Sequence, residues 1–71
     1  MLDFNFAPHM YDMQSCVLIV EIFGEKMYFY ESPSAKALEN MGYRCIGKCD
    51  GYFLYFHESR KERRFVKDGA A

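Results

Sequence analysis

Three cysteines and two histidines are the side chains of this sequence best suited to nucleophilic or metal chemistry. Cys45 and Cys49 are four residues apart, which on an extended strand places them on one face about 13 Å from each other. At that separation the thiols can neither form a disulfide nor share a metal ion. We therefore expect Cys16, Cys45 and Cys49 to be buried free thiols, and we expect neither a metal site nor a cofactor.

His57 is the other candidate for chemistry. It precedes Glu58 at the expected end of a strand, with Arg44 expected opposite, and an imidazole in that position could act as a general base. The alternative interpretation is a solvated residue at a strand end. Ser32 and Ser34 already serve the start of a helix, and the chain contains no phosphate-binding glycine motif. We expect no catalytic residues and interpret the protein as not an enzyme.

Size and composition predict one small domain. The sequence has 71 residues, which we divide into an N-terminal arm at residues 1–14 and a single domain at residues 15–71. The odd number of cysteines favours a reducing compartment. The first residues are acidic and lack an apolar run, so no signal peptide is expected. The longest apolar run, residues 16–20, is too short to span a membrane. A cytoplasmic location follows as an expectation.

Local signals predict the elements that would position these residues. Residues 15–23 and 26–31 read as strands around a Gly24–Glu25 turn. Ser32 is expected to cap a helix that has Pro33 at its first position, continues over residues 34–41 and ends at Gly42. Residues 43–49 and 52–57 read as strands joined by Asp50–Gly51, and residues 63–67 as a fifth strand. The predicted fold is α+β, an antiparallel sheet of four to five strands in the order ββ-α-ββ(β), with one short helix packed on one face.

Alternation along these strands leaves one face of the sheet with too many large apolar groups. The better core face carries Leu18, Val20, Ile22, Phe29, Cys45, Leu54 and Phe56, and the helix is expected to cover it. The second face carries Ile19, Phe23, Tyr28, Tyr30, Ile46, Phe53 and Tyr55. Contiguous exposed groups of this kind mark interaction surfaces. Three interpretations stay open: the arm covers this face, a protein partner or a second copy binds it, or nucleic-acid bases stack on it.

Charge is divided between the two parts of the chain. Residues 1–31 carry five acidic side chains and one basic side chain, net −4, whereas residues 32–71 carry eight basic and five acidic side chains, net +3. Arg60, Arg63 and Arg64 belong to the basic run, which is interrupted by Glu62. This polarity suits a protein partner of complementary charge as well as nucleic acid, since a uniformly basic chain would point to nucleic acid more firmly.

The segment KALENMGY (residues 36–43), followed by the Asp50–Gly51 hairpin, resembles the helix–glycine–aromatic–strand–strand run of HicA-type toxins. Those are small ribonucleases with the shape of a double-stranded-RNA-binding domain, and the similarity covers about half of this chain. Their catalytic histidine lies at the tip of this hairpin, where this chain has Asp50, Gly51 and Tyr52. The resemblance therefore implies the shape and not the activity.

In size and layout the whole chain is also similar to small phage-encoded inhibitors, including anti-CRISPR proteins. That resemblance implies a stoichiometric binding protein that blocks a larger host machine, such as a defence complex, through surface residues.

We therefore expect a non-catalytic binding protein that acts by occupying a protein surface. Tyr28, Tyr30, Phe53 and Tyr55 are the expected anchors, because aromatic side chains and arginine dominate binding energetics. Arg60, Arg63 and Arg64 are expected to steer association. A homodimer is a further expectation, and the alternative function is a small nucleic-acid-binding module. No membrane partner is expected.

Overall fold

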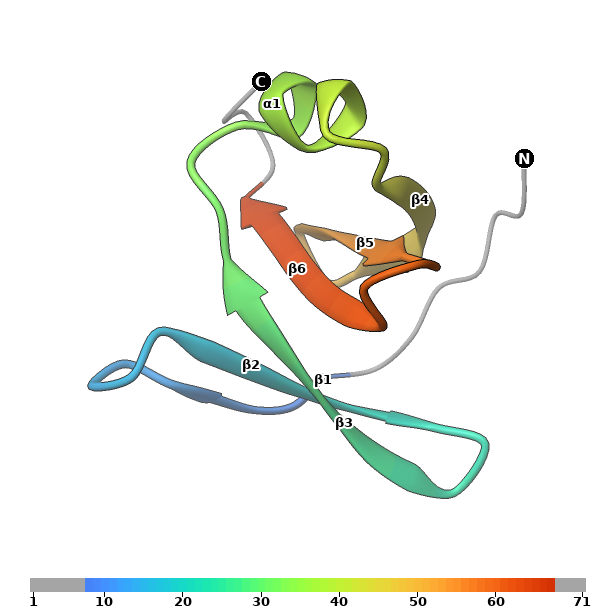
Figure 1. Ribbon diagram of the computed structural model, residues 1–71. Helices are drawn as coiled ribbons and strands as arrows, with labels where there is room; N and C mark the ends of the chain where they lie inside the picture. Colours follow the sequence, from blue (N-terminus) through green and yellow to red (C-terminus); the bar gives the residue numbers. More distant parts are fainter. Residues whose placement is uncertain (1–7, 68–71) are drawn as a thin grey trace.

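The computed structural model describes residues 8–67, which form a curled mixed sheet with a short helix packed against it (Figure 1). The elements are β1 (Pro8–Asp12), β2 (Val17–Ile22), β3 (Glu25–Glu31), α1 (Ala35–Asn40), β4 (Arg44–Cys49), β5 (Tyr52–His57) and β6 (Glu62–Lys67). The six strands of these residues lie in the order β1-β2-β3-β6-β5-β4. Neighbouring strands are antiparallel except β3 and β6, which are parallel.

The sheet is larger and less uniform than the sequence predicted. The α+β class with a single helix agrees with the described residues, whereas the expectation of four to five antiparallel strands is wrong because six strands form a mixed sheet. The expected fifth strand is present as β6, but it lies in the middle of the sheet beside β3. Part of the expected arm, Pro8–Asp12, pairs with β2 as an edge strand. The rest of the expected arm, residues 1–7, lies outside the described residues.

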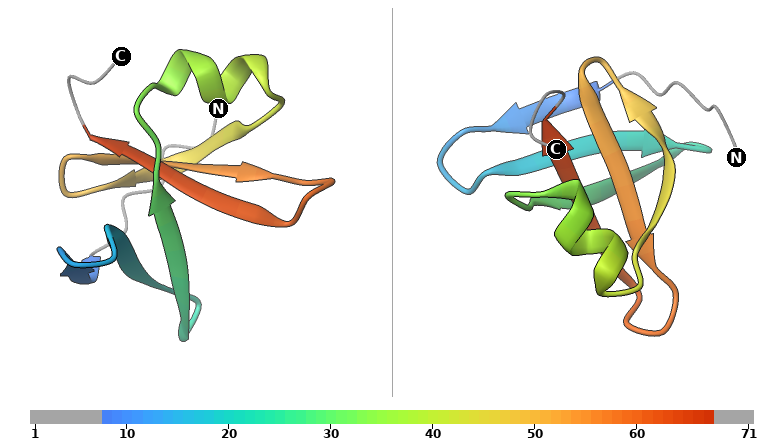
Figure 2. Two further views of the ribbon diagram at one scale, coloured as in Figure 1. Left: turned by 60° about the vertical axis from the view of Figure 1, so that its left-hand side comes forward. Right: turned by 90° about the horizontal axis from the view of Figure 1, so that it is seen from above.

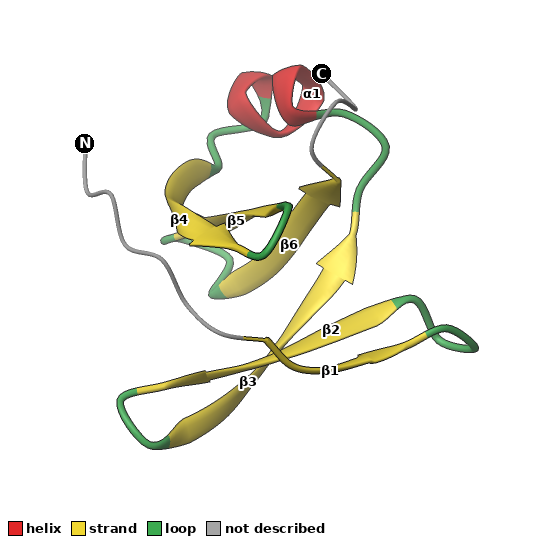
Figure 3. Ribbon diagram, turned by 180° about the vertical axis from the view of Figure 1, so that it is seen from behind, coloured by secondary structure: helices red, strands yellow, loops and turns green. Residues whose placement is uncertain are grey.

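A short parallel contact joins two antiparallel halves, which we call the β1–β3 half and the β4–β6 half. Tyr30 pairs with Arg64 and Glu31 with Phe65, and the amide of Ser32 donates to the carbonyl of Phe65 at 2.9 Å. Because adjacent strands are rotated relative to one another, a sheet of this width curls. The two halves turn until their inner surfaces face each other (Figures 1 and 3).

The inner surface of the curled sheet is the main core. Its buried members are Leu18, Val20, Ile22, Phe29, Cys49, Leu54 and Phe65. Tyr11 of β1 reaches across to the β4–β6 half and stacks on Tyr52, with ring centroids 6.0 Å apart. The edges of both rings meet the ring of Phe65. Side chains from both ends of the chain therefore close the same core.

The helix lies on the opposite side of the β4–β6 half, so the molecule has three layers there (Figure 2). Leu38 of α1 packs with Tyr43, Tyr55 and Val66 in a second buried cluster. The expectation that the helix covers the face of Leu54 is wrong, because the β1–β3 half already covers that face. With six residues, α1 is about 9 Å long and covers only one half of the sheet.

Both ends of the helix are capped by their own sequence. The N-cap is Ser34 and not Ser32 as expected, and the Ser34 hydroxyl accepts a hydrogen bond from the amide of Ala37. At the other end Gly42 has a φ of 97°. The amides of Gly42 and Tyr43 donate to the carbonyls of Glu39 and Leu38, which is the Schellman arrangement. Gly42 thus ends the helix as predicted.

The two hairpin turns differ in how well the sequence predicted them. Asp50–Gly51 joins β4 and β5 as expected, and both residues have positive φ. The first turn lies one residue earlier than expected, at Phe23–Gly24, so that Ile22 pairs with Glu25. This moves the register by two residues, and the faces of β2 and β3 stay as predicted because side chains alternate with a period of two.

A bulge in β4 changes the predicted faces of that strand. The pairing shifts between Cys45 and Gly47, so Cys45 pairs with Tyr55 instead of Phe56, and Arg44 pairs with Phe56 instead of His57. An extra residue in one strand reverses the side-chain alternation beyond it. As a result Cys45 joins the cluster under the helix while Ile46 packs against the main core.

The fold separates two tyrosines that the sequence treated alike. Tyr55 is 5% exposed, whereas Tyr28 is 48% exposed. We expect Tyr55→Ala to lower the free energy of unfolding by about 3 kcal/mol, since it leaves a cavity under α1. Tyr28→Ala, the matched control, is expected to change it by less than about 1 kcal/mol. Urea unfolding in dilute solution measures both, and equal losses would contradict this arrangement of the layers.

Candidate interaction surface

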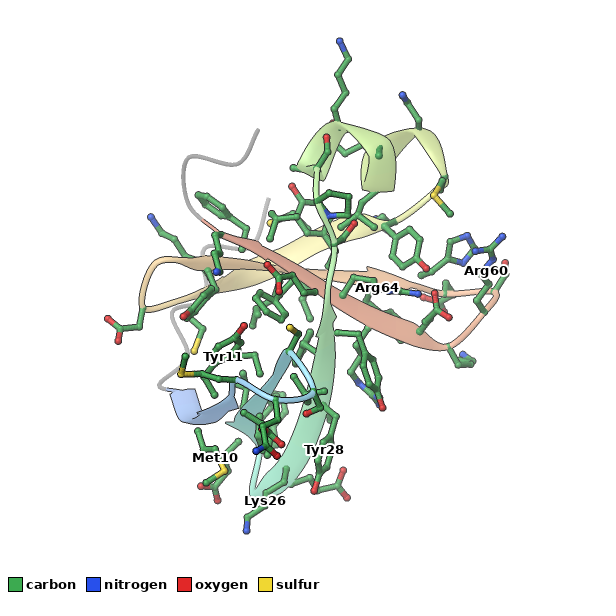
Figure 4. All side chains as sticks on the ribbon, turned by 90° about the vertical axis from the view of Figure 1, so that its left-hand side faces the viewer. Met10, Tyr11, Lys26, Tyr28, Arg60 and Arg64 are labelled. Atoms are coloured by element: carbon green, nitrogen blue, oxygen red, sulfur yellow. The ribbon has the colours of Figure 1, made fainter. Side chains whose placement is uncertain are left out.

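On the side of the β1–β3 half that faces away from the main core, no helix or strand of residues 8–67 packs over the sheet. We call this side the outer face, and its residues are Met10, Asp12, Val17, Ile19, Glu21, Lys26, Tyr28 and Tyr30. In Figure 4 Met10, Lys26 and Tyr28 project away from the β4–β6 half, whereas Tyr11 points toward it. The alternation in β1 and the register of β2 with β3 together produce this division.

Strand pairing arranges the outer face in rows across the strands. Met10, Ile19 and Tyr28 form one row, and Val17 and Tyr30 lie side by side in the next. Met10, Tyr28 and Tyr30 are 54%, 48% and 49% exposed. Because paired side chains lie about 5 Å apart, Met10, Tyr28 and Tyr30 make a contiguous exposed surface around the half-buried Ile19, with hydroxyl groups at the tyrosine tips, whereas Val17 is buried at 7% exposed. A surface of this composition is typical of a protein contact.

Charged side chains border the apolar rows. Glu21 and Lys26 oppose each other across β2 and β3 and form the row nearest the turn. Asp12 lies beside Val17 in the edge strand. A hydrogen bond from Ser15 is the main cause that lowers the pKa of Asp12, and the amide of Gln14 also donates to its carboxylate at 3.0 Å. An apolar centre with a charged rim is the usual anatomy of an interface.

Phe23 stands at the tip of the β2–β3 hairpin, next to the outer face. It is 94% exposed and has a φ of 52°, followed by Gly24 with a φ of 81°. Turns with two positive φ values favour asparagine and glycine, and a bulky residue in that conformation is an outlier. The alternation of the sequence placed Phe23 on the second face and did not predict its position in the turn. The phenylalanine–glycine pair between two strands was the signal that could have indicated it.

The four expected anchors separate into two pairs. Tyr28 and Tyr30 are on the outer face, whereas Tyr55 is buried in the cluster under α1 and Phe53 packs against that cluster, partly buried. All four do lie on the same side of the curled sheet, since Tyr30 pairs with Arg64 and Arg64 with Tyr55. The sequence therefore predicted the shared side correctly and missed that the helix covers one end of it.

The three expected steering arginines also separate. Arg64 lies beside Tyr30 at the junction of the halves, and its Nε is 3.5 Å from Glu62. Arg63 pairs with Phe56, so it projects to the other side of the sheet. Arg60 is exposed in the β5–β6 turn, and Figure 4 shows it beyond the helix end and far from Tyr28. Arg64 alone of the three adjoins the outer face.

His57 has a structural role at the end of α1. Its Nδ1 accepts the amide of Arg60 at 3.2 Å, so the proton is on Nε2, which donates to the carbonyl of Met41 at 3.0 Å. Tyr43 packs edge-to-face against the ring at 4.9 Å. A Cβ added at Gly42 would lie 3.1 Å from Nε2, so the close approach of this ring also favours glycine there. With both nitrogens engaged, the imidazole is not placed as a general base.

Glu62 completes this cluster. It accepts a hydrogen bond from the Tyr43 hydroxyl and pairs with Arg64. The hydrogen bond from Tyr43 is the main cause that lowers the pKa of Glu62, and Arg64 and Arg60 lower it further. These contacts fix the β5–β6 turn against the end of the helix. Within residues 8–67, no three side chains of the histidine, cysteine, aspartate or glutamate type are grouped to hold a metal ion.

The cysteines differ in burial more than expected. All three thiols are free, but only Cys49 is buried, Cys45 is intermediate and Cys16 is exposed in the β1–β2 turn. Burial raises the pKa of Cys49 to about 11. The expectation that all three are buried is wrong for Cys16, because the apolar run that contains it begins one residue before the strand.

Comparisons of the chain with protein-family models, curated proteins and solved structures found no match. In the described part of the chain, helical structure falls short of the length and apolar character needed to cross a bilayer.

The turn at Phe23 generates one prediction. Phe23→Asn is expected to raise the free energy of unfolding by about 1 kcal/mol, because asparagine tolerates the positive φ and the exposed ring contributes little packing. Phe23→Ala is the control, since it removes the ring and keeps the unfavourable backbone preference. Urea denaturation compares the three proteins. A loss of stability in Phe23→Asn would mean that the ring packs within the fold.

A second prediction concerns acid. Since the folded state lowers the pKa of Glu62, the carboxylate stabilises the fold at neutral pH, and this contribution is lost as the pH falls below the ordinary value of about 4.3. Glu62→Gln is expected to be less stable than the wild type at pH 7 and to approach it at low pH. Denaturation curves across the acid range test this, and a constant difference at every pH would contradict it.

Proposed function

We propose that this protein is a non-catalytic binding protein that acts by occupying a protein surface, and that the outer face is its contact. The observation that carries the proposal is the contiguous exposure of Met10, Tyr28 and Tyr30 over a folded sheet. Burial of apolar area is the main source of binding free energy, and tyrosine adds a polar tip that tolerates solvent before binding.

The distribution of charge supports a protein partner over nucleic acid. Residues 8–31, which build the outer face, carry four acidic side chains and one basic side chain. Apart from Lys26, the basic groups belong to the other half of the molecule, and Arg64, which adjoins the outer face, pairs with Glu62. Binding of nucleic acid requires basic groups beside the stacking aromatics. The aromatic side chains of the outer face belong to the acidic half of the molecule, and this arrangement favours a protein partner over nucleic acid.

The bonding of His57 supports the non-catalytic part of the proposal. The single histidine whose side chain the structure describes uses both ring nitrogens to hold backbone groups of Met41 and Arg60. A phage-type inhibitor of a host defence complex is the more specific form of the proposal. It rests on the size and layout of the chain, and a protein contact of the kind described here is the property that such an inhibitor needs.

The experiment compares immobilised wild type with a Tyr28→Ser, Tyr30→Ser double variant as bait in a cell lysate. The proposal expects the wild type to retain protein that the double variant does not. Lys48→Ser is the matched control, because Lys48 is exposed on β4 in the other half of the molecule and its loss is expected to change nothing. Identical retention by the wild type and the double variant, for a wild type that is also monomeric in solution, would contradict the proposal.

Labelled single-stranded DNA and double-stranded RNA test the alternative. The proposal expects no binding of either oligonucleotide at low salt. Binding that weakens with added salt and requires Tyr28 would contradict the protein-binding role and favour a nucleic-acid-binding module.

A further inference from the structure

The charged row of the outer face has opposite charges on its two strands, so it is complementary to the same row of a second copy of the chain. Glu21 is on β2 and Lys26 is on β3, directly opposite each other, and both are exposed. The two apolar rows have the same division, with Val17 and Ile19 on β2 and the larger Tyr30 and Tyr28 on β3. Consider a line midway between β2 and β3. The charged row has its acid on the β2 side of this line and its base on the β3 side, and the apolar rows have the smaller side chains on the β2 side and the larger ones on the β3 side.

Consider a twofold axis that runs parallel to that line and lies between two facing sheets. Rotation about this axis exchanges the positions of β2 and β3 in the facing copy. The β2 strand of one chain then lies over the β3 strand of the other, so each Glu21 faces a Lys26 of the other chain. By the same exchange, Ile19 faces Tyr28, which sets the smaller side chain against the larger one, and Tyr30 lies over the position of the buried Val17. Isologous interfaces require this self-complementarity. Two sheet faces packed in this way lie about 10 Å apart, as in a β-sandwich.

The same axis runs toward the Phe23–Gly24 turn. It therefore brings the Phe23 side chains of both copies to the same end of the pair, beyond the charged row of Glu21 and Lys26. This accounts for a phenylalanine that is 94% exposed in one chain. A contact of this kind also adds a layer over the half of the sheet that α1 leaves uncovered.

We infer that a second copy of this chain occupies the outer face, in a twofold dimer whose axis runs between β2 and β3. The inference rests on the proposed protein-binding role of that face and names the partner. The dimer pairs Glu21 of each chain with Lys26 of the other. The exposed basic turn at Arg60 lies outside the contact and stays accessible on both copies.

The experiment is a charge exchange between chains, with mass measured by light scattering over a concentration series. The wild type is expected to reach twice the chain mass of 8.4 kDa. Glu21→Lys and Lys26→Glu each place like charges opposite one another in a self-pair, so each variant alone is expected to lose the doubled mass. Their equimolar mixture is expected to recover it, because every lysine of one variant then faces a glutamate of the other.

Two control variants carry the same charge changes elsewhere. Glu25→Lys alters β3 at a position outside the outer face, and Lys48→Glu alters β4. Both are expected to retain the doubled mass. Circular dichroism confirms that each variant is folded, which is expected because the altered side chains are exposed.

Three results would overturn the inference. One is a wild type that stays monomeric at every concentration. Another is a wild-type dimer that both charge reversals leave intact, since the contact would then lie on another surface. The third is a mixture that stays monomeric when each variant alone is monomeric. If the wild type is monomeric and the lysate experiment still shows retention that depends on Tyr28 and Tyr30, the second copy is wrong and the protein-binding role stands.

Discussion

The parallel contact between the end of β3 and β6 is the constraint on which the rest of the structure depends. Phe65 contributes two interactions to this contact. It pairs with Glu31, and its carbonyl accepts a hydrogen bond from the amide of Ser32. Without this contact the chain would consist of two separate antiparallel units of three strands. With it, Phe65 belongs to one buried cluster with Leu54 of one half and Phe29 of the other, and the sheet closes on its own inner surface.

That closure decides which surface is left for function. The inner surface is consumed by the main core, so the helix packs on the outer side of the β4–β6 half. Because α1 has six residues, it covers Tyr55 and leaves Tyr28 and Tyr30 uncovered on the same side of the sheet. The outer face is thus a consequence of a short helix on a wide curled sheet.

The sequence predicted what depends on local interactions. Asp50–Gly51 and Gly42 mark their turn and cap correctly, since positive φ selects glycine over short range. The alternation of β2 and β3 placed Tyr28 and Tyr30 correctly. Tyr55 was misplaced because alternation shows which residues share a side and not what covers that side. The central position of β6 and the bulge at Cys45 depend on non-local pairing, for which a single sequence carries no short-range signal.

The central claim is that the two halves enclose one core around Phe65. A nuclear Overhauser spectrum of the labelled protein tests it most directly through contacts of the Phe65 ring. The account expects cross-peaks from this ring to Leu54 in β5 and also to Leu18 and Phe29 in the β1–β3 half. Cross-peaks to Leu54 alone, with Leu18 and Phe29 showing contacts only within β2 and β3, would contradict the closed sheet and the outer face that follows from it.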